Sequence, residues 1–474
     1  MADVAILGGL VAFFLCDDGR FLVINTNNYK HVEVGSYAVE GKNASMTTSI
    51  GVLTGTFSDD GKSIYCNELQ VTAVLDNKYF AIDEDFIYVY REIPELEVAG
   101  YEVYPFDATK SNYGAIKENI NGYNTIMIAE QAFLNNTNLT SIVIPDSVIA
   151  ISDQAFDGCT NLTNIELGNP AFYGDAVFQN CTSLTNIVIP KGTLSIGHSV
   201  FANCTNLKTI SLPDGLIGLG SRVFANCTSL SNVIIPESVD CITNSLFIGC
   251  TGLTSVTIPK ATMYISAHAF SGCTSLDNII IPNNVSAIKD YAFYNCESLT
   301  SISLTSCSSF GTYVFYNCKN LTNVTLPEDM QVITDHMFYG CSNLNIEIPD
   351  SVTSIGESAF EGCSSLTSIN IPDDYGYTFG KYAFKGCSGL TSLVIPEGVE
   401  ILPEGLLMSC TELMSISLPN SLTKIGESVF FLCGANYPVF NGTIEEWNNI
   451  KKDTNWDNMS CIQYIVCTDG KVTL

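Results

Sequence analysis

The amino-acid sequence predicts a β-solenoid, a stack of similar short coils, over most of its length. Three recurring features indicate it: a phenylalanine every 22 to 24 residues, a cysteine three residues after nearly every phenylalanine, and an I-x-I-P step between them. A repeat period of about 20–50 residues is typical of solenoids. The phenylalanines are Phe133, Phe156, Phe178, Phe201, Phe224, Phe247, Phe270, Phe293, Phe315, Phe338, Phe360, Phe384 and Phe430, and Leu407 takes the same place between the last two.

Residues 269–291 show one complete repeat, with the pattern A-F-x-x-C-x-x-L-x-x-I-x-I-P-x-x-V-x-x-I. The I-x-I step has period two, so its two isoleucines face the core while the residue between them faces outward. Proline then ends the strand because it has no N–H to donate to a ladder. We expect the A-F-x-x-C segment to form a tight helical corner. A single coil leaves two sides uncovered, so each coil needs its neighbours in order to fold.

The repeated cysteines predict a ladder of buried structural thiols. Because they share one position in every coil, they stack on one another, and a free cysteine behaves as a small apolar residue. Disulfide bonds or redox chemistry are the alternatives, and a bridge between Cys461 and Cys467 is a separate one. No C-x-x-C pair or Cys/His cluster indicates zinc. The ladder cysteines are Cys159, Cys181, Cys204, Cys227, Cys250, Cys273, Cys296, Cys318, Cys341, Cys363, Cys387, Cys410 and Cys433, with Asn136 in the first repeat.

The bulk composition indicates a folded, acidic protein. Hydrophobic residues make up 46% of the 474 residues and charged residues only 15%, which is far from the composition of a disordered chain. Lys and Arg total 20 against 49 Asp and Glu, which gives a net charge of −29. This charge argues against nucleic acid and against an anionic membrane surface as partners.

Residues 1–98 are expected to form a small antiparallel β domain, and residues 99–123 a connector. Apolar, β-prone runs flank the Asp-Gly turns at Asp17–Gly19 and Ser58–Gly61, as in β-hairpins. The run Val4–Cys16 is apolar enough for a signal peptide. However, no Lys or Arg precedes it and no clear cleavage site follows, so we expect a strand pair there. The run is also too short for a transmembrane helix.

Residues 434–474 are expected to cap the stack. Thr443–Glu446 has the form of a capping box and opens a short helix that carries Trp447 and Ile450. Two closing strands are expected around Ile462–Cys467 and Lys471–Leu474. Such a cap covers the last sheet edge, which would otherwise pair with other chains.

Residues 124–433 resemble the BspA-like, or Treponema pallidum type, leucine-rich repeats, whose consensus is L-x-x-I-x-I-P-x-x-V-x-x-I-x-x-x-A-F-x-x-C. The resemblance implies a right-handed, mostly β leucine-rich-repeat solenoid of about 13–14 coils of 23 residues, with parallel strands on its concave face. It also implies a non-catalytic surface protein that binds host matrix proteins, other cells or other microbes. The segment from Phe440 to Ile450 resembles the closing segment of BspA-like proteins from gut bacteria.

Four coils depart from the repeat, and tolerated drift or a contact site would explain each departure. Numbering the coils from the I-x-I step at Ile142, the second has Gly168–Pro170 and the eighth has Thr305–Cys307 in place of the usual strand-ending proline. The tenth coil is one residue short at Asn345–Ile348. The eleventh has Asp373–Tyr377 in place of V-x-x-I.

The sequence carries no recognisable catalytic constellation, so we expect no enzyme activity and no cofactor or metal. The histidines His198, His268 and His336 belong to different coils, too far apart for a triad. No phosphate loop, nucleophile elbow or paired-carboxylate site is present. The acidic group Asp83–Asp85 is read as a solvated loop, with a calcium site as the alternative.

The outward positions of the I-x-I strands are the candidate binding site for a protein ligand. The middle residue of the step is apolar on alternate coils, at Val188, Ile234 and Ile280, within a field of hydroxyl and amide side chains. Exposed apolar patches mark protein contacts, although β-branched residues also suit exposed strands. Aromatic platforms for sugars are missing there, which makes a glycan the weaker candidate. The candidate residues are Val188, Asn232, Ile234, Ser255, Thr257, Asn278, Ile280 and Ser301.

These patterns favour a non-catalytic adhesion or recognition protein, extracellular or on a cell surface, that binds a protein ligand or a host or microbial surface receptor. One alternative is a bacteriophage virion component, such as a fibre, receptor-binding or decoration protein, because no convincing signal peptide or anchor is found. A second alternative is an enzyme within residues 1–98. Ligand identity and oligomeric state do not follow from the sequence.

Overall fold

The computed structural model describes the backbone of nine strands within the first 82 residues. It then describes residues 83–474, apart from residues 84, 95–97, 106–108 and 373–375. The chain divides into two compact units. The first unit comprises Met1–Phe156 and Asn164–Pro170, and the second comprises Asp157–Thr163 and Ala171–Leu474.

The first unit begins with an antiparallel sheet of eight strands in chain order. This confirms the expected N-terminal antiparallel β domain, including the strand pairs β2–β3 and β6–β7. The turns Asp17–Gly19 and Ser58–Gly61 lie outside the described residues. The strands are β1 (Asp3–Leu7), β2 (Val11–Leu15), β3 (Arg20–Asn25), β4 (His31–Glu40), β5 (Asn43–Thr48), β6 (Gly51–Phe57), β7 (Ser63–Cys66) and β8 (Val71–Val74).

A second sheet of this unit changes from antiparallel to parallel pairing. Strand β10 (Phe86–Ile93) pairs antiparallel with β9 (Phe80–Ile82) and with β11 (Val98–Pro105). Strand β11 then pairs parallel with β13 (Tyr123–Ile128), which also pairs with the short β12 (Asn119–Ile120). The range 99–123, expected to be a connector, therefore contains most of β11. Strand β13 continues in parallel to β15 (Ala150–Ile151), where the coil pattern begins.

The acidic group before β10 is tied to the protein. Asp83 accepts hydrogen bonds from the backbone N–H of Phe86 (2.8 Å) and from the Tyr88 hydroxyl (3.0 Å). Asp85 accepts from Lys110 and from the N–H of Gly114. The expectation of a solvated loop is wrong for these two carboxylates, because they hold the turn against the following segment. Glu84 lies outside the described residues.

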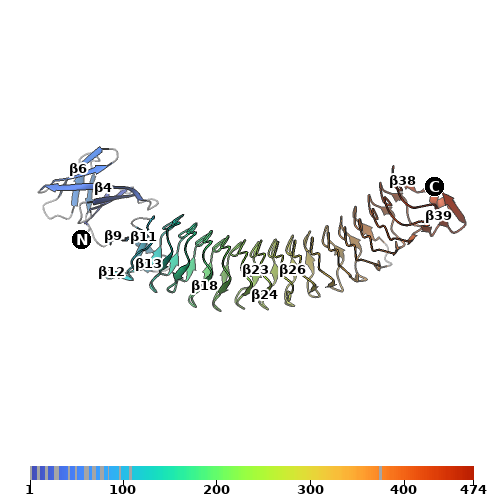
Figure 1. Ribbon diagram of the computed structural model, residues 1–474, viewed down its shortest axis with the longest axis horizontal. Coiled ribbons are helices and arrows are strands. Elements are labelled where there is room, and N and C mark those ends of the chain that lie inside the picture. The colour runs from blue at the N-terminus through green and yellow to red at the C-terminus, as the bar shows by residue number, and fades with distance from the viewer. Residues whose placement is uncertain are drawn as a thin grey trace. The chain divides into compact units, whose positions relative to one another are not determined.

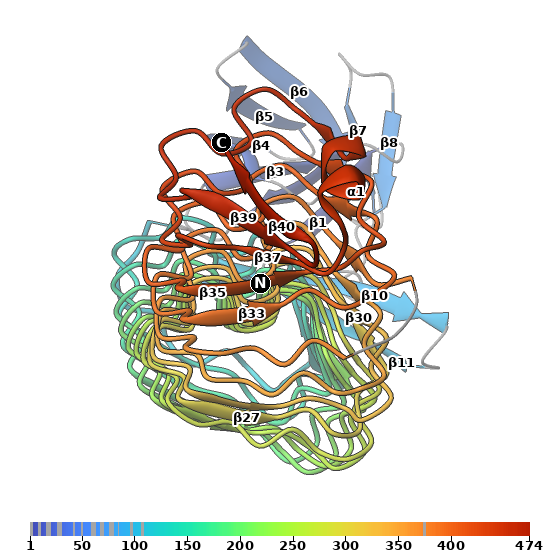
Figure 2. The same ribbon diagram turned by 90° about the vertical axis from the view of Figure 1, so that its right-hand side faces the viewer.

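Most coils contribute two short strands to two parallel ladders, whereas the seventh, tenth and eleventh coils have only an isolated bridge residue at the I-x-I step. Figure 1 shows the coils of the second unit following one another in chain order, and in Figure 2 β27 lies along a different side of the coil from β30. The I-x-I strands are β14 (Ser141–Val143), β16 (Asn164–Glu166), β18 (Asn186–Val188), β20 (Thr209–Ser211), β22 (Asn232–Ile234), β24 (Ser255–Thr257), β27 (Ser301–Ser303), β29 (Asn323–Thr325), β33 (Ser392–Val394) and β35 (Ser415–Leu418).

The second ladder is formed by the V-x-x-I segments of the coils. It is the more continuous of the two, since its strands pair in runs of three or more, as in β23–β25–β26–β28, whereas most I-x-I strands pair only in twos. Its strands in the second unit are β17 (Phe172–Tyr173), β19 (Ser195–Ile196), β21 (Gly218–Leu219), β23 (Cys241–Ile242), β25 (Tyr264–Ile265), β26 (Ala287–Ile288), β28 (Ser309–Phe310), β30 (Val332–Ile333), β31 (Ser354–Ile355), β32 (Thr378–Phe379), β34 (Ile401–Leu402) and β36 (Lys424–Ile425).

The A-F-x-x-C corner forms a third line of coil-to-coil hydrogen bonds, although it is not a strand. The N–H of Phe270 donates to the carbonyl oxygen of Ala292 in the next coil (2.8 Å), and that of Gly272 donates to Tyr294 (2.7 Å). In nearly every coil the residue two before the phenylalanine makes a third such bond, as His268 does to Asp290 (3.0 Å). A corner without these bonds would leave buried N–H groups unpaired, which is costly.

The corner is built from turns, so the expectation of a helical corner is wrong. Each corner holds two residues in the left-handed region, which an α-helix does not allow. The residue two after the phenylalanine is asparagine or glycine in most coils, as at Asn203 (φ 61°) and Gly272 (φ 76°). The residue two before it is often neither, as at Arg222 (φ 61°) and Tyr291 (φ 57°). This conformation costs an L-residue roughly 1–2 kcal/mol, which the bonds to the next coil offset.

The core is a stack of identical side chains. The rings of Phe247 and Phe270 lie 5.5 Å apart with a 12° interplanar angle, and all the repeated phenylalanines are buried. The cysteines are buried beside them, as predicted. From Cys204 to Cys410 each thiol also donates to the carbonyl oxygen of the phenylalanine one coil earlier, as Cys273 does to Phe247 at 3.2 Å. The cysteine is therefore a hydrogen-bond donor between coils as well as an apolar residue.

The irregular coils keep their core. Cys307 occupies the valine position of V-x-x-I in the eighth coil, and Tyr377 follows that position directly in the eleventh; both are buried. In the second coil, Gly168 passes so close to the carbonyl of Pro145 that a Cβ would lie 2.3 Å from its oxygen. Residues 373–375 lie outside the described residues. The shortened tenth coil differs from the others, because a hollow lies over it.

The C-terminal segment adds the expected helix and hairpin. Helix α1 (Ile444–Asn449) begins at a capping box formed by Thr443 and Glu446, and it buries Trp447. Strand β37 (Val439–Phe440) extends the I-x-I ladder, and β38 (Lys451–Lys452) extends the other. Strand β39 (Tyr464–Cys467) pairs with β37 and then antiparallel with β40 (Gly470–Thr473). The N–H of Phe430 in the last corner donates a hydrogen bond to the carbonyl oxygen of Trp456 (3.1 Å). Cys461 and Cys467 are both free, so no bridge joins them.

The buried thiols predict a loss of stability at alkaline pH. Burial raises the pKa of Cys250 and of Cys387 to about 12, against about 8.5 in an unfolded chain. The stability that each contributes is therefore fully present below about pH 8.5 and is lost as pH rises towards 12. We expect a loss of about 2 kcal/mol per thiol by pH 10. Denaturation midpoints measured under reducing conditions from pH 7 to 10 test this. A Cys250→Ala variant should show a weaker pH dependence, and an equal slope would contradict the account.

Candidate binding face

The I-x-I face of the second unit is formed by the outward residues of the I-x-I segments in coils three to thirteen. Strand periodicity places them, since buried and exposed residues alternate within each strand. In β18, Ile187 is buried and Val188 is 71% exposed. The same alternation recurs in β22, β24 and β27. Side chains on this face therefore do not pack in the core, and the fold does not restrict their identity.

The apolar residues on this face form a spaced stripe. Ile234 is 71% exposed and Ile280 is 78% exposed, values close to that of Val188. The ladder pairs Val188 with Ser211 and Ile234 with Thr257, so a hydroxyl side chain lies beside each apolar one. Neighbouring strands lie about 4.8 Å apart, which puts consecutive members of the stripe about 10 Å apart.

The structure brings the eight candidate residues together on this one face. Asn232 and Ser255 are partners in the ladder β22–β24. Asn278 and Ser301 form an isolated bridge between the seventh and eighth coils. All eight side chains are exposed. Asn232, Ser255, Asn278 and Ser301 form one column along the stack, and Thr257 and the three stripe residues form the column beside it. The face is a row of shallow contacts, without an enclosed cleft.

An apolar hollow of about 730 Å³ lies on this face between the sixth and seventh coils. Four candidate residues, Ser255, Thr257, Asn278 and Ile280, line it. The I-x-I ladder is interrupted at this point. The N–H of Ile235 donates to Thr257 (3.2 Å), but no corresponding bond joins the sixth coil to the seventh among the described residues.

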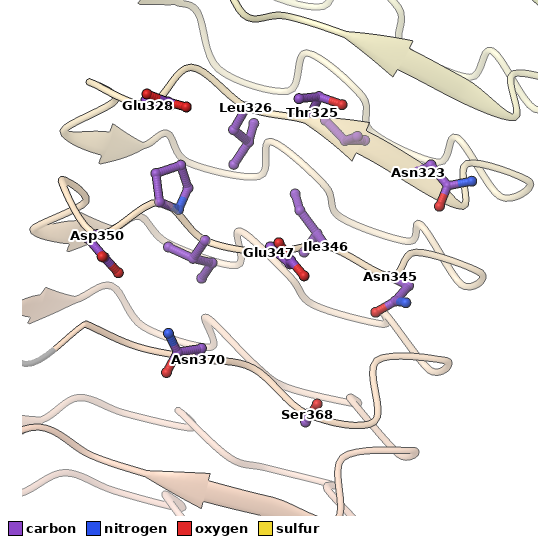
Figure 3. Close-up of a pocket in the computed structure, with 13 residues that line it drawn as sticks. Asn323, Thr325, Leu326, Glu328, Asn345, Ile346, Glu347, Asp350, Ser368 and Asn370 are labelled. Carbon is purple, nitrogen blue, oxygen red and sulfur yellow. The ribbon is translucent and has the colours of Figure 1, made fainter.

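A second hollow, of about 800 Å³, lies where the ladder is interrupted again, over coils nine to eleven. Figure 3 shows Glu328 and Asp350 at one end of it, Glu347 between, and the amides of Asn323 and Asn345 at the other end. The shortened tenth coil runs through the middle of this hollow. Its lining contains no Lys or Arg.

The sequence reasoning missed the second hollow and an aromatic corner. Extending the two outward columns past Thr325 would have found Glu347, Asn370 and Val394, of which Val394 is 61% exposed. The aromatic corner is formed by two further columns, two residues before and one residue after the repeated phenylalanine. Reading these columns would have found its seven members, His268, Tyr291, Tyr313, His336, Tyr294, Tyr316 and Tyr339.

The rings of the aromatic corner stack on one another. His268 and Tyr291 lie 4.7 Å apart, Tyr313 and His336 lie 4.3 Å apart, and Tyr316 and Tyr339 lie 4.4 Å apart between ring centroids. Interplanar angles are below 10° in these pairs. The inner rings therefore present edges and hydroxyls to solvent, and their faces are covered, which leaves no open platform for a sugar within a row.

Catalytic side chains do not converge in the part of the chain that the structure describes. No group of three or more His, Cys, Asp or Glu side chains is arranged to hold a metal ion there. His198 accepts a hydrogen bond from the N–H of Ser221 in the next coil (2.9 Å), and the other two coil histidines belong to the aromatic corner. No helix within these described residues is long and apolar enough to cross a membrane.

The family described as "BspA type Leucine rich repeat region (6 copies)" matches residues 126–254, 171–296, 241–346 and 333–451. These overlapping matches span residues 126–451, well over half of the chain. The chain belongs to the BspA-type leucine-rich repeat family. This confirms the resemblance on which the predicted solenoid was based, and the match extends past residue 433 into the C-terminal segment.

Solved structures of bacterial leucine-rich repeat proteins are similar to this chain. A leucine-rich repeat protein from Bacteroides ovatus is 24% identical, covers 82% of this chain and 99% of its own, and superposes with a TM-score of 0.61. The pneumococcal vaccine antigen PcpA is 18% identical, covers 82% and 98%, and has a TM-score of 0.50. A leucine-rich cell surface protein from Faecalibacterium prausnitzii is 24% identical, covers 80% and 99%, and has a TM-score of 0.45. A comparison with curated proteins gives no match.

Adjacent isoleucines test the assignment of the face. Ile279→Ala removes a side chain that is 4% exposed, and we expect a loss of about 2–5 kcal/mol. Ile280→Ala removes one that is 78% exposed, and we expect a change within about 0.5 kcal/mol. Thermal unfolding followed by circular dichroism compares the two. Equal losses would contradict the assigned orientation of this strand segment.

Proposed function

We propose that this protein is a non-catalytic adhesion or recognition protein that binds a protein ligand through the I-x-I face. The single observation that carries the proposal is the stripe of Val188, Ile234 and Ile280, which exposes large aliphatic side chains that the fold does not need. A row of exposed apolar side chains, one of which (Ile280) lines a shallow hollow, supports association with another protein surface. A glycan is the weaker candidate, because no aromatic ring lies in this stripe.

Family membership supports a location at the cell surface. The Faecalibacterium protein is described as a cell surface protein and the pneumococcal one as a vaccine antigen. A surface adhesin needs a long, rigid array that presents many weak contacts, and a solenoid provides it. The virion component stays an alternative prediction, and no observation on this face favours it over adhesion.

Lysine substitutions in the stripe are expected to weaken ligand binding. The double variant Ile234→Lys, Ile280→Lys places two charges in the apolar contact, so affinity should fall by about tenfold or more. The measurement is binding of the labelled full chain to host and microbial cells by flow cytometry, followed by Kd measurement with each purified ligand.

The matched control carries the same two charges on the other ladder. Val332 and Ile401 are 45% and 50% exposed there, and Val332→Lys, Ile401→Lys should keep wild-type binding. A ligand that is lost equally from both double variants, or from the control alone, would contradict the proposal. Circular dichroism checks that each variant keeps its fold.

A further inference from the structure

The two hollows of the I-x-I face differ in chemistry and lie along two shared columns. Ile280 and Glu347 both stand two residues before the strand-ending proline, in the seventh and tenth coils. Lys260, Glu328 and Asp350 all follow such a proline directly, in the sixth, ninth and tenth coils. Because equivalent positions stack in register, the first column changes from apolar at Ile280 to acidic at Glu347. Between the sixth and tenth coils the second column changes from basic to acidic, although Asp214 and Glu237 come before Lys260 in it.

The carboxylates of the second hollow have no compensating charge within the described residues. None of the ion pairs there engages Glu328, Glu347 or Asp350. All three side chains are exposed and face the same hollow (Figure 3). Elsewhere on the surface, acidic groups such as Glu297, Glu361 and Glu404 pair with lysines. The hollow therefore favours a ligand that brings positive charge to it.

The distance between the two hollows limits the form of the ligand. Three coil steps separate Ile280 from Glu347, which is about 14 Å at about 4.8 Å per step. An extended polypeptide covers this distance in about four residues. A linear segment thus reaches both hollows while lying along the stack, across the strands.

We propose that this face binds a polypeptide segment of defined polarity, in the order acidic, aliphatic, basic. Its acidic group lies near Lys260, its aliphatic side chain packs against Ile280 in the apolar hollow, and its Lys or Arg lies among Glu328, Glu347 and Asp350. Unpaired backbone groups where the I-x-I ladder is interrupted offer further hydrogen bonds to the segment. This inference rests on the proposed function, because it assigns the partner's chemistry at the same face.

The charge pattern also separates this ligand from others. An anionic polymer is repelled by the second hollow, which has three carboxylates and no cation in its lining. A small polycation such as spermidine has no use for Ile280, so its binding would be insensitive to that residue. Dependence on both hollows at once is the mark of the proposed segment.

A display library of random linear peptides, selected on the full chain, tests the proposal. Selected peptides should share an aliphatic residue and, about four residues away, a Lys or Arg. Fluorescence anisotropy then gives Kd for each synthetic peptide with wild type, Ile280→Ser and Glu347→Lys, and both substitutions should weaken binding by about tenfold or more. Glu412→Lys, which changes the same charge at an exposed site outside both hollows, should leave Kd within about twofold.

Exchanging the charges of the peptide and of the second hollow is the more specific experiment. A peptide whose basic residue is replaced by Glu should lose binding to wild type and regain it with the variant Glu328→Lys, Glu347→Lys, Asp350→Lys. Binding that ignores Glu347→Lys, or spermidine displacing every peptide without any effect of Ile280→Ser, would overturn the proposal. If the cell ligand is still lost in Ile234→Lys, Ile280→Lys while the acidic hollow has no effect, only this inference fails. If neither the double variant Ile234→Lys, Ile280→Lys nor the substitutions in the acidic hollow affect binding, the proposed function fails as well.

Discussion

The hydrogen bonds that join each coil to the next are the interaction on which the rest of the structure depends. Three lines of them run along the stack: the I-x-I ladder, the V-x-x-I ladder and the corner around each repeated phenylalanine. The corner matters most, because its backbone leaves regular structure and uses two left-handed residues per coil. Alternate N–H groups of the corner, such as those of Phe270 and Gly272, donate to the following coil, and the thiols from Cys204 to Cys410 each add a bond to the preceding one. The stack therefore stabilises coils that cannot fold alone.

This dependence divides the residues of each coil into two classes. The phenylalanine, the cysteine and the inward aliphatic residues are constrained by packing. Each of them contacts the equivalent residue in the coil before and in the coil after, so a substitution disturbs three coils. The outward residues of the I-x-I segments are not needed for this packing, and there the sequence varies between hydroxyl, amide, acidic and large exposed aliphatic side chains. A recognition surface in such a molecule is a row of side chains with a period set by the stack. The hollow over the tenth coil lies in that row and leaves the buried residues of the coil in place.

Most of the fold follows from the sequence because repetition identifies inward and outward positions many times over. The core positions of the coil, the buried cysteines, the capping box at Thr443 and the closing hairpin were all readable from pattern. The conformation of the corner could not be predicted. Arginine and tyrosine adopt a positive φ there, against the usual preference for glycine and asparagine, and only the hydrogen bonds to the next coil explain this conformation. The change from antiparallel to parallel pairing at β11 was also hidden, since both kinds of strand share the same composition. The eight candidate residues do share one face, yet the two hollows on it were not readable from the residue types.

Native-state hydrogen exchange on a Phe293→Ala variant tests the central claim most directly. Phe293 is buried and stacks between Phe270 and Phe315, at 5.3 and 5.5 Å. If coil-to-coil bonding governs stability, protection of the corner N–H groups should fall most in the seventh and eighth coils and recover gradually in both directions along the stack. Loss confined to the substituted coil, or an equal loss along the whole stack, would contradict the account.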